Sequence, residues 1–586
     1  MRNLTLTLLC ALLALSAGCK EKPKTEPSTE PKAAVEPVAD TGVAVQTADA
    51  KAFLDAYQKD FSELERVQTS SYWKAANSGQ KADFDAYAKA DLALKKLHSD
   101  PGRYAEIKRL LASGKDHPAL TRRALEVAKL AFEGNQLPAD LLEKMVAQST
   151  EIERLFNTFR AELDGEKLSN NDLLERLSKS NDSTERKRIW EALKAAGAAV
   201  APKLVALAEL RNQAAAKLGY KDFWYMRIAL QEHDPDRLLA LFDKLDELTA
   251  GPFKAMKAEL DAELAKRFGI QVAQMRPWHY DNPFFQEPPP SDAIDLDVFY
   301  KDKTKEDIVA LGKAFYADIG LPADDIIARS DFFEREGKDQ HAFCITIDRA
   351  ADVRMLLNIK PTASWMDTML HETGHAVYYE WTDRALPFNL REAAHIFTTE
   401  AVAMLFGALA KNPRWMIDYA GADESKVREK AKAILEQRRR EQLIFARWAM
   451  VMLHFEKALY ENPKRDLNKL WYDTVERYQM LTRPEGRDAP DWAAKPHFTI
   501  APVYYHNYLL GEVFAAQLRA ALVTLAGHEG PPCELSYKGR KDFGRFFKEK
   551  IFAPGMRQSW PAFVEQATGS ALSPDAFASE LKPRAE

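Results

Sequence analysis

The segment His371-Glu372-Thr373-Gly374-His375 lies inside a helical stretch, Ser364 to Trp381. On a helix, residues four positions apart share one face, so the imidazoles of His371 and His375 can point at one ion. Glu372 lies next to the first of them and can reach a water molecule held by that ion. The pattern predicts a helical metal site with two histidine ligands and Glu372 as the general base.

A tetrahedral catalytic zinc site needs a third protein ligand and keeps one position open for water. Glu400 is the candidate, 25 residues after His375, and it stands at the start of the apolar helical stretch Thr399 to Phe406. A carboxylate in so apolar a helix is costly unless a charge pairs with it. The alternative is a carboxylate that only marks the start of a helix. Weaker candidates for the third ligand are Glu380, Asp383 and Glu392.

Amphipathic helical patterns dominate the chain from about Ala50 to its end. One helix is expected to begin with Asp234 as N-cap and Pro235 in the first turn. Apolar residues then follow with spacings of three and four: Leu238, Leu241, Phe242, Leu245 and Leu248. Similar patterns cover Phe53–Val67, Tyr104–Leu111, Leu141–Leu163, Trp190–Leu218, Val427–Tyr460 and Tyr504–Leu525.

One segment departs from the helical pattern. His341 to Ile347 and Val353 to Ile359 are extended, apolar-rich runs that Asp348 to Asp352 separates. This arrangement predicts a β-hairpin. Because the hairpin comes just before the metal motif, we expect a mainly helical body with one short sheet beside the site.

Composition and charge are those of an ordinary globular protein. The chain has 586 residues, 46% hydrophobic and 29% charged, with a formal net charge of -5. Two to four domains or one large helical enzyme fit this length. The charge gives no electrostatic footprint for nucleic acid, so no nucleic-acid partner is expected. A glycine-rich phosphate loop and a serine nucleophile elbow are also absent from the sequence.

The N-terminus has the pattern of an export signal. Met1-Arg2-Asn3 is weakly basic, Leu4 to Leu15 is apolar but too short to span a bilayer, and small residues then precede Cys19. The pattern resembles a bacterial lipoprotein signal, in which residues 1–18 are removed and Cys19 is lipidated. The alternative is ordinary secretory cleavage. Both place the protein outside the cytoplasm, facing the periplasm or the cell exterior.

A flexible linker is expected to follow the lipidated cysteine. Residues 20–49 contain prolines at 23, 27, 31 and 37 and no aromatic residue, leucine or isoleucine. Such a segment buries too little apolar surface to offset its ordering entropy. The predicted organisation is a signal peptide (1–18), a lipid-anchored linker (19–49) and a helical zinc metallopeptidase domain (50–586). A disulfide between Cys344 and Cys533 is permitted outside the cytoplasm but not indicated.

Several motifs together resemble the angiotensin-converting-enzyme family of peptidyl-dipeptidases. The His-Glu-x-x-His motif is followed by Leu390-Arg391-Glu392-Ala393 and Thr399-Glu400-Ala401-Val402. Further similarity is found in Arg211-Asn212-Gln213-Ala214-Ala215, Lys495-Pro496-His497, Tyr505-His506-Asn507-Tyr508 and residues 555–581. The resemblance implies that Glu400 is the third zinc ligand. It also implies a mainly α fold with a deep active-site groove and one zinc ion per chain.

The resemblance assigns further roles. His341 and Ala342 are similar to the strand that pairs with the substrate backbone. His497 and Tyr508 are similar to the pair that stabilises the tetrahedral intermediate, with Tyr504 or Tyr505 as alternatives for the tyrosine. Groups similar to those that hold the C-terminal carboxylate of the substrate are Lys495, Tyr505 and Gln286. Such a clamp implies release of C-terminal dipeptides from oligopeptides.

The sequence departs from the family at three places. Asn507 replaces the arginine that binds chloride in animal members, and Met404 replaces an aspartate that supports a zinc histidine. Ligating histidines usually need such a partner, so another group is expected to supply it. The stretch from His497 to the tyrosines is one residue longer than in the family.

Three other functions can be weighed against these features. A thimet-type oligopeptidase also has a helical body and this metal motif, but it cuts peptides internally. A zinc-free binding lipoprotein is a non-enzymatic alternative, although all three ligands and the base are present. Hydrolysis of a non-peptide amide has no support in the sequence, and the oligomeric state is not readable from it.

Overall fold

The computed structural model describes residues 41–113, 117–289 and 295–582 and divides into two compact units. The smaller unit contains residues 41–136 and Pro387–Leu390. The larger unit contains Leu137–Leu386 and the chain from Arg391 onward. The predicted signal peptide, Cys19 and residues 20–40 of the predicted linker lie outside the described residues.

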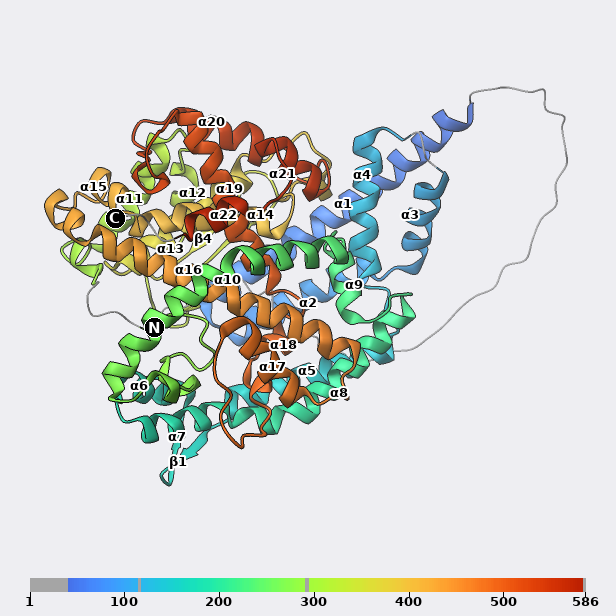
Figure 1. The fold of residues 1–586 in the computed structure, drawn as a ribbon. Helices are drawn as coiled ribbons and strands as arrows, with labels where there is room; N and C mark the ends of the chain where they lie inside the picture. The colour runs from blue at the N-terminus through green and yellow to red at the C-terminus, as the bar shows by residue number, and fades with distance from the viewer. Residues whose placement is uncertain (1–40, 114–116, 290–294, 583–586) are drawn as a thin grey trace, which may run out of the picture. The chain divides into compact units, whose positions relative to one another are not determined.

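The smaller unit is helical. Its elements, in shades of blue in Figure 1 except the last, are α1 (Thr41–Ser78), α2 (Lys81–His98), α3 (Pro101–Ser113), α4 (Ala119–Glu133) and the short η4 (Phe388–Leu390). Rings of Tyr57, Phe61, His98 and Phe132 pack together in its core. Residues 41–49, expected as the end of the flexible linker, are instead the first turns of α1. No proline follows Pro37 there, so nothing removes a helical hydrogen bond.

The larger unit is also mainly helical, as predicted. Its helices are α5 (Ala139–Thr158), α6 (Asn170–Lys179), α7 (Ser183–Lys194), α8 (Ala196–Lys217), α9 (Phe223–Leu230), α10 (Pro235–Phe268), α11 (Lys305–Asp318), α12 (Asp324–Arg329), α13 (Ala363–Glu380), α14 (Ile396–Gly407), α15 (Pro413–Asp418), α16 (Glu424–Glu461), α17 (Leu467–Gln479), α18 (His497–Ile500), α19 (His506–Ala526), α20 (Lys541–Phe546), α21 (Trp560–Thr568) and α22 (Asp575–Glu580).

Local sequence signals fixed several of these helix ends. Asp234 caps α10 as predicted, because its carboxylate accepts hydrogen bonds from the backbone N–H groups of Asp236 and Arg237. The predicted helix over 190–218 is instead two helices that meet at Ala195. Gly197 follows this break by two residues, but a single glycine inside a helical pattern does not by itself mark a helix end.

Two short antiparallel sheets lie in the larger unit, where the sequence analysis expected one. The predicted hairpin forms between β3 (Phe343–Thr346) and β4 (Val353–Leu356). A second hairpin joins β1 (Ala161–Leu163) and β2 (Glu166–Leu168); the predicted helix over 141–163 ends at Thr158, so the prediction was wrong only at its last residues. Asp164 and Gly165 connect these strands with φ of 55° and 82°, so an Asp-Gly hairpin turn was the missed signal.

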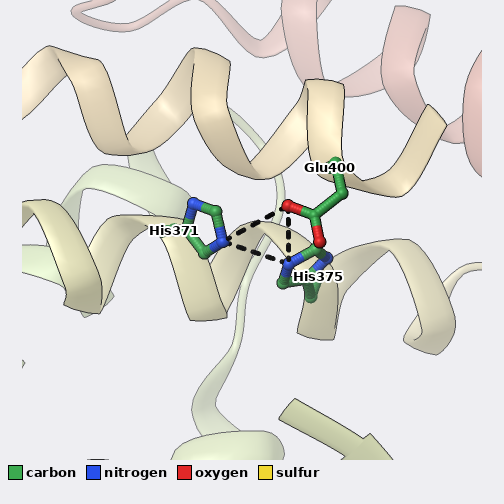
Figure 2. A group of neighbouring side chains, drawn as sticks. All are labelled: His371, His375 and Glu400. Carbon is green, nitrogen blue, oxygen red and sulfur yellow. Dashed lines mark hydrogen bonds and ion pairs between the residues drawn. The ribbon is translucent and has the colours of Figure 1, made fainter. Parts of the chain in front are cut away.

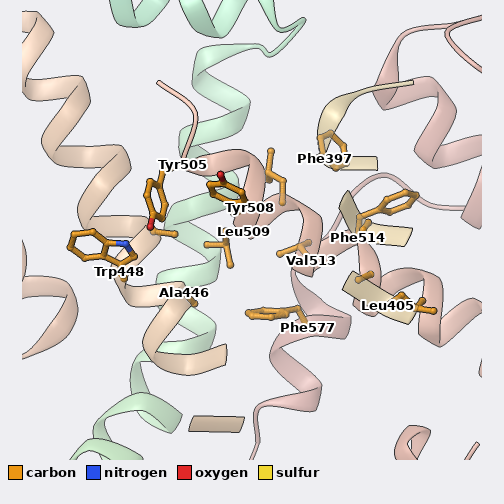
Figure 3. Packing of buried hydrophobic residues seen from close by; sticks show 14 of the residues in the cluster. Phe397, Leu405, Ala446, Trp448, Tyr505, Tyr508, Leu509, Val513, Phe514 and Phe577 are labelled. Atoms are coloured by element: carbon orange, nitrogen blue, oxygen red, sulfur yellow. The ribbon is translucent and has the colours of Figure 1, made fainter. Parts of the chain in front are cut away.

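Three helices make the core that positions the metal motif. The central helix α14 packs against both α13 and α19, and Figure 3 shows Phe397 and Leu405 beside Val513 and Phe514. By length and hydropathy α19 resembles a membrane span, but 56% of that stretch is buried inside the protein. Its burial against α14 and α16 makes it a core helix.

Glycines allow these helices to approach closely. A Cβ atom at Gly374 in α13 would lie 3.0 Å from Cα of Ala403 in α14. At Gly511 in α19 it would lie 3.3 Å from Cβ of Glu400. A side chain at Gly374 would press on the backbone of α14, and one at Gly511 would press on the side chain of Glu400. The close packing brings the polar residues of three helices to one place.

Candidate metal centre

Helix α13 presents the two histidines of the motif on one face. Thr362 caps this helix by accepting a hydrogen bond from the backbone N–H of Trp365. One turn apart, the rings of His371 and His375 have centroids 4.8 Å apart, and their Nε2 atoms are 3.2 Å apart. The helix therefore aims both nitrogens at one point.

Helix α14 supplies the third side chain, as Figure 2 shows. Oε2 of Glu400 lies 3.8 Å from Nε2 of His371 and 4.0 Å from Nε2 of His375. The carboxylate is only 3% exposed. The structure thus brings together the three residues that the sequence analysis selected, and the group has the composition of a metal site. The weaker candidates instead pair with arginines: Glu380 with Arg384, Asp383 with Arg557, and Glu392 with Arg349.

The dimensions of this group suit a zinc ion. A triangle with sides of 3.2, 3.8 and 4.0 Å has its corners about 2.1 Å from one common point. Zn–N and Zn–O bonds are roughly 2.0–2.2 Å long. Two imidazole nitrogens and one carboxylate oxygen are also a donor set that zinc uses in catalytic sites. The residues therefore fit the metal that the family resemblance implies.

The electrostatics of the pocket also favour a cation. Burial raises the pKa of Glu400 to about 7. Burial and the charge of Glu400 together raise the pKa of Glu372 to about 8. Burial lowers the pKa of His371 to about 4, so its imidazole is neutral and able to bind a metal at neutral pH. The two buried carboxyls of Glu372 and Glu400 therefore lie beside neutral imidazoles, without a positive charge from the histidines. A divalent ion would provide that charge.

Glu372 is placed for proton transfer. It is fully buried on α13, and neither carboxylate oxygen has a hydrogen-bond partner among the described residues. The backbone N–H of Cys344 on β3 acts on this carboxylate and offsets a part of the rise in the Glu372 pKa. A buried carboxylate without a partner is costly, and at a catalytic site it is available to a reacting water.

Thr399 supplies a partner for one of the histidines. Its Oγ1 lies 2.8 Å from Nδ1 of His375 and is buried with it. With the proton on Nδ1, His375 keeps the lone pair of Nε2 directed toward Glu400. The sequence analysis expected another group to replace the aspartate missing at Met404, and for His375 that group is Thr399. A hydroxyl directly before Glu400 in an otherwise apolar helix was the signal that could have identified it.

The residues expected to stabilise the oxyanion gather around Tyr505, whose ring lies 5.0 Å from that of His497. Both ring nitrogens of His497 are buried without a partner among the described residues. Burial and, to a smaller extent, the charge of Lys495 lower the pKa of His497 to about 3. The ring of Tyr508 lies 5.1 Å from that of Tyr504 and 5.4 Å from that of Tyr505. Besides burial, the charge of Glu400 raises the pKa of both Tyr508 and Tyr504. Both phenols therefore stay protonated near the metal centre, and Tyr504 is close enough to remain an alternative.

The predicted carboxylate clamp is assembled from distant parts of the chain. Nζ of Lys495 donates to Oε1 of Gln286 at 2.7 Å and lies 5.4 Å from the ring centroid of Tyr505. Figure 3 shows Tyr505 between Trp448 and Tyr508. Burial lowers the pKa of Lys495 to about 7, although the charge of the nearby Glu287 carboxylate offsets a part of this effect. An incoming carboxylate would form an ion pair with this buried ammonium.

Strand β3 lies along the site. It pairs with β4 on one side, and its Cys344 backbone faces Glu372. The opposite edge is therefore suited to pair with an extended peptide. Ala342 is buried just before β3, whereas the side chain of His341 is 66% exposed and lies 3.4 Å from Asp339.

A mainly helical body with a His-Glu-x-x-His helix, a carboxylate from the next helix and a buried unpartnered glutamate has the architecture of a metallopeptidase. The profile of the family described as angiotensin-converting enzyme matches residues 44–583. Because this match covers nearly the whole chain, the protein belongs to the angiotensin-converting-enzyme family of peptidases. No individual curated protein matches the chain.

Proposed function

We propose that the protein is a zinc-dependent peptidyl-dipeptidase that releases dipeptides from the C-terminal ends of oligopeptides. The observation that carries this proposal is the convergence of His371, His375 and Glu400 at zinc-binding distances. Family membership supports peptide hydrolysis. The cluster of Lys495, Gln286 and Tyr505 supports recognition of a terminal carboxylate.

Glu372 acts as the proton carrier in this reaction. A zinc ion held by the three ligands would supply Lewis acidity, which makes water nucleophilic at neutral pH and polarises a peptide carbonyl. The Glu372 carboxylate removes a proton from the attacking water and then delivers it to the leaving amine.

The oxyanion is stabilised by protein donors. The phenol of Tyr508 donates a hydrogen bond to the developing negative charge, and His497 provides a second donor. Burial keeps the phenol protonated, since its pKa lies far above neutral pH. Loss of one such preorganised donor typically costs about 100- to 1000-fold in kcat.

The carboxylate cluster determines where the peptide is cut. When Lys495 and Tyr505 hold the C-terminal carboxylate, the peptide extends along β3 toward Glu372. The fixed separation between the cluster and the metal centre selects one bond near the C-terminus. Oligopeptides with a free C-terminus are therefore the proposed substrates.

A comparison of acid and amide peptides tests this assignment. We expect C-terminal amidation to lower kcat/KM by about 10- to 100-fold, the cost of losing a hydrogen bond to a charged group. Mass spectrometry should identify a dipeptide as the C-terminal product. The control variant Lys495→Met should cut both peptides at similar, low rates. Internal cleavage of acid and amide with equal efficiency would instead identify an endo-oligopeptidase.

We also propose that the mature protein is an exported lipoprotein anchored at Cys19. The apolar segment before Cys19 and the proline-rich segment after it support this proposal. Expressed in a bacterial host, wild-type protein should sediment with membranes, and Cys19→Ser should appear in the soluble fraction. Equal distribution of the two would argue against lipidation.

A further inference from the structure

The tyrosines and His497 lie at the two ends of one buried loop. The short helix α18 begins at His497, and a loop from Ala501 to Tyr505 leads into α19, which carries Tyr508. None of these residues belongs to a metal-binding helix. Their positions relative to Glu400 therefore depend on what holds the loop.

Val503 is the strained residue of this loop. Its φ is 54°, in the left-handed region, and its side chain is only 2% exposed. Branching at Cβ makes this conformation unfavourable, so it persists only where the surroundings hold the backbone. Val503 directly precedes Tyr504 and Tyr505, and it lies in the stretch that is one residue longer than in the family.

Side chains from two other elements hold both backbone groups of Val503. Oε1 of Glu456, in α16, accepts a hydrogen bond from the Val503 N–H at 2.9 Å. Nε2 of Gln231, just after α9, donates to the Val503 carbonyl at 3.1 Å. Glu456 is 3% exposed, so a charged or strongly polar group has been buried to make this contact.

Gln231 and a further side chain, Arg211, hold the two ends of the loop. Oε1 of Gln231 accepts a hydrogen bond from Nδ2 of Asn507, in the first turn of α19, at 2.7 Å. At the other end, Arg211 of α8 donates from Nη1 to the carbonyl of Phe498 at 2.6 Å and from Nη2 to that of Thr499 at 2.8 Å. Arg211 is 5% exposed and also donates to the Tyr460 hydroxyl of α16 at 3.0 Å.

We propose that Arg211, Gln231 and Glu456 are positioning residues, which hold the strained loop so that His497 and Tyr508 face the metal centre. None of the three touches the group that would bind metal or the residues expected to contact substrate. The inference rests on the proposed function, because it assigns these residues to the oxyanion-stabilising step of that reaction. A displacement of about 1 Å at a catalytic group can cost about 100-fold in rate.

A double-mutant cycle separates positioning from general stabilisation. We expect Glu456→Ala and Gln231→Ala each to lower kcat about 10- to 100-fold with one zinc still bound per chain. Tyr508→Phe should lower kcat about 100-fold. Glu456 and Gln231 hold Val503 next to the tyrosines, whereas Arg211 holds the end of the loop near His497. The effects of Glu456→Ala and Gln231→Ala should therefore run through Tyr508, so each double variant with Tyr508→Phe should be no more than about threefold slower than its slower single variant. Independent effects would instead multiply.

Two further variants complete the test. Val503→Gly adopts a positive φ without strain, so it should restore part of the kcat lost in Glu456→Ala. Thr249→Val is the matched control, because it removes buried hydrogen bonds to Leu245 and Arg447 without contacting the loop, and its effect should multiply with that of Tyr508→Phe.

The outcomes distinguish the two proposals. The proposal that these residues position Tyr508 would be overturned by a wild-type kcat in both Glu456→Ala and Gln231→Ala. It would also be overturned if their effects multiplied with that of Tyr508→Phe. If Glu456→Ala does not fold, the cycle with the half-buried Gln231 decides the question alone. Absence of zinc-dependent cleavage by the wild-type protein would overturn the proposed function itself.

Discussion

Glu372→Gln should retain one zinc ion per chain and lose about 100- to 10,000-fold in kcat. Glutamine has the same shape, and Glu372 is not among the three converging ligand residues, so the metal site should keep its composition. An amide cannot accept and return a proton at neutral pH, so water activation is lost. The measurements are zinc content by mass spectrometry of the metal and steady-state hydrolysis of an internally quenched oligopeptide.

The binding of substrate gives the control for this variant. Because the carboxylate clamp is unchanged, the affinity of Glu372→Gln for an uncleaved peptide should stay within a few-fold of the wild-type value. A variant that binds zinc and peptide normally and still turns over at the wild-type rate would remove Glu372 from its role as the base.

Glu400→Gln should raise the free energy of unfolding of the metal-free protein and lower that of the zinc-loaded protein. In the metal-free fold, burial raises the Glu400 pKa from 4.5 to about 7, so ionising this carboxyl destabilises the fold progressively as pH rises from 4.5 to above 7. Metal-free Glu400→Gln should therefore be more stable than metal-free wild type at pH 8, by about 3 kcal/mol. At pH 5 the difference should nearly vanish.

Zinc should reverse the order of stability. A neutral amide is a poor ligand for zinc. Loss of a residue that only hydrogen-bonds to a ligand lowers metal affinity roughly 10- to 100-fold, so loss of the ligand itself should lower zinc affinity by more. Thermal unfolding with and without a chelator measures both effects, since the stabilisation of a fold by zinc grows with the logarithm of its affinity. Glu380→Gln is the matched control and should keep the zinc-dependent shift. An unchanged shift in Glu400→Gln would exclude Glu400 as a ligand.

Local patterns made the metal centre predictable from the sequence. Two histidines four residues apart need only a helix to share a face, and α13 provides it. The interval to Glu400 favoured this residue over Glu380, Asp383 and Glu392 but could not establish it as a ligand, because a loop separates α13 from α14. The family resemblance supplied that link, and the packing of the two helices agrees with it.

Residues that act through tertiary contacts were not predictable. Glu456 and Gln231 meet Val503 across 47 and 272 positions of sequence, and no periodicity marks such pairs. The extra residue after His497 was visible as a difference in length, but its left-handed backbone was not. The second hairpin was missed for another reason, since the Asp-Gly signal at 164–165 was present but the residues directly before it, up to Leu163, were assigned to a helix.

Crystals of the wild-type protein grown with stoichiometric zinc would test the central claim most directly. Diffraction data collected on the two sides of the zinc absorption edge locate the ion by its anomalous difference peak. We predict one peak per chain, at bonding distance from Nε2 of His371, Nε2 of His375 and a carboxylate oxygen of Glu400. A zinc peak elsewhere, or Glu400 directed away from the ion, would contradict the account.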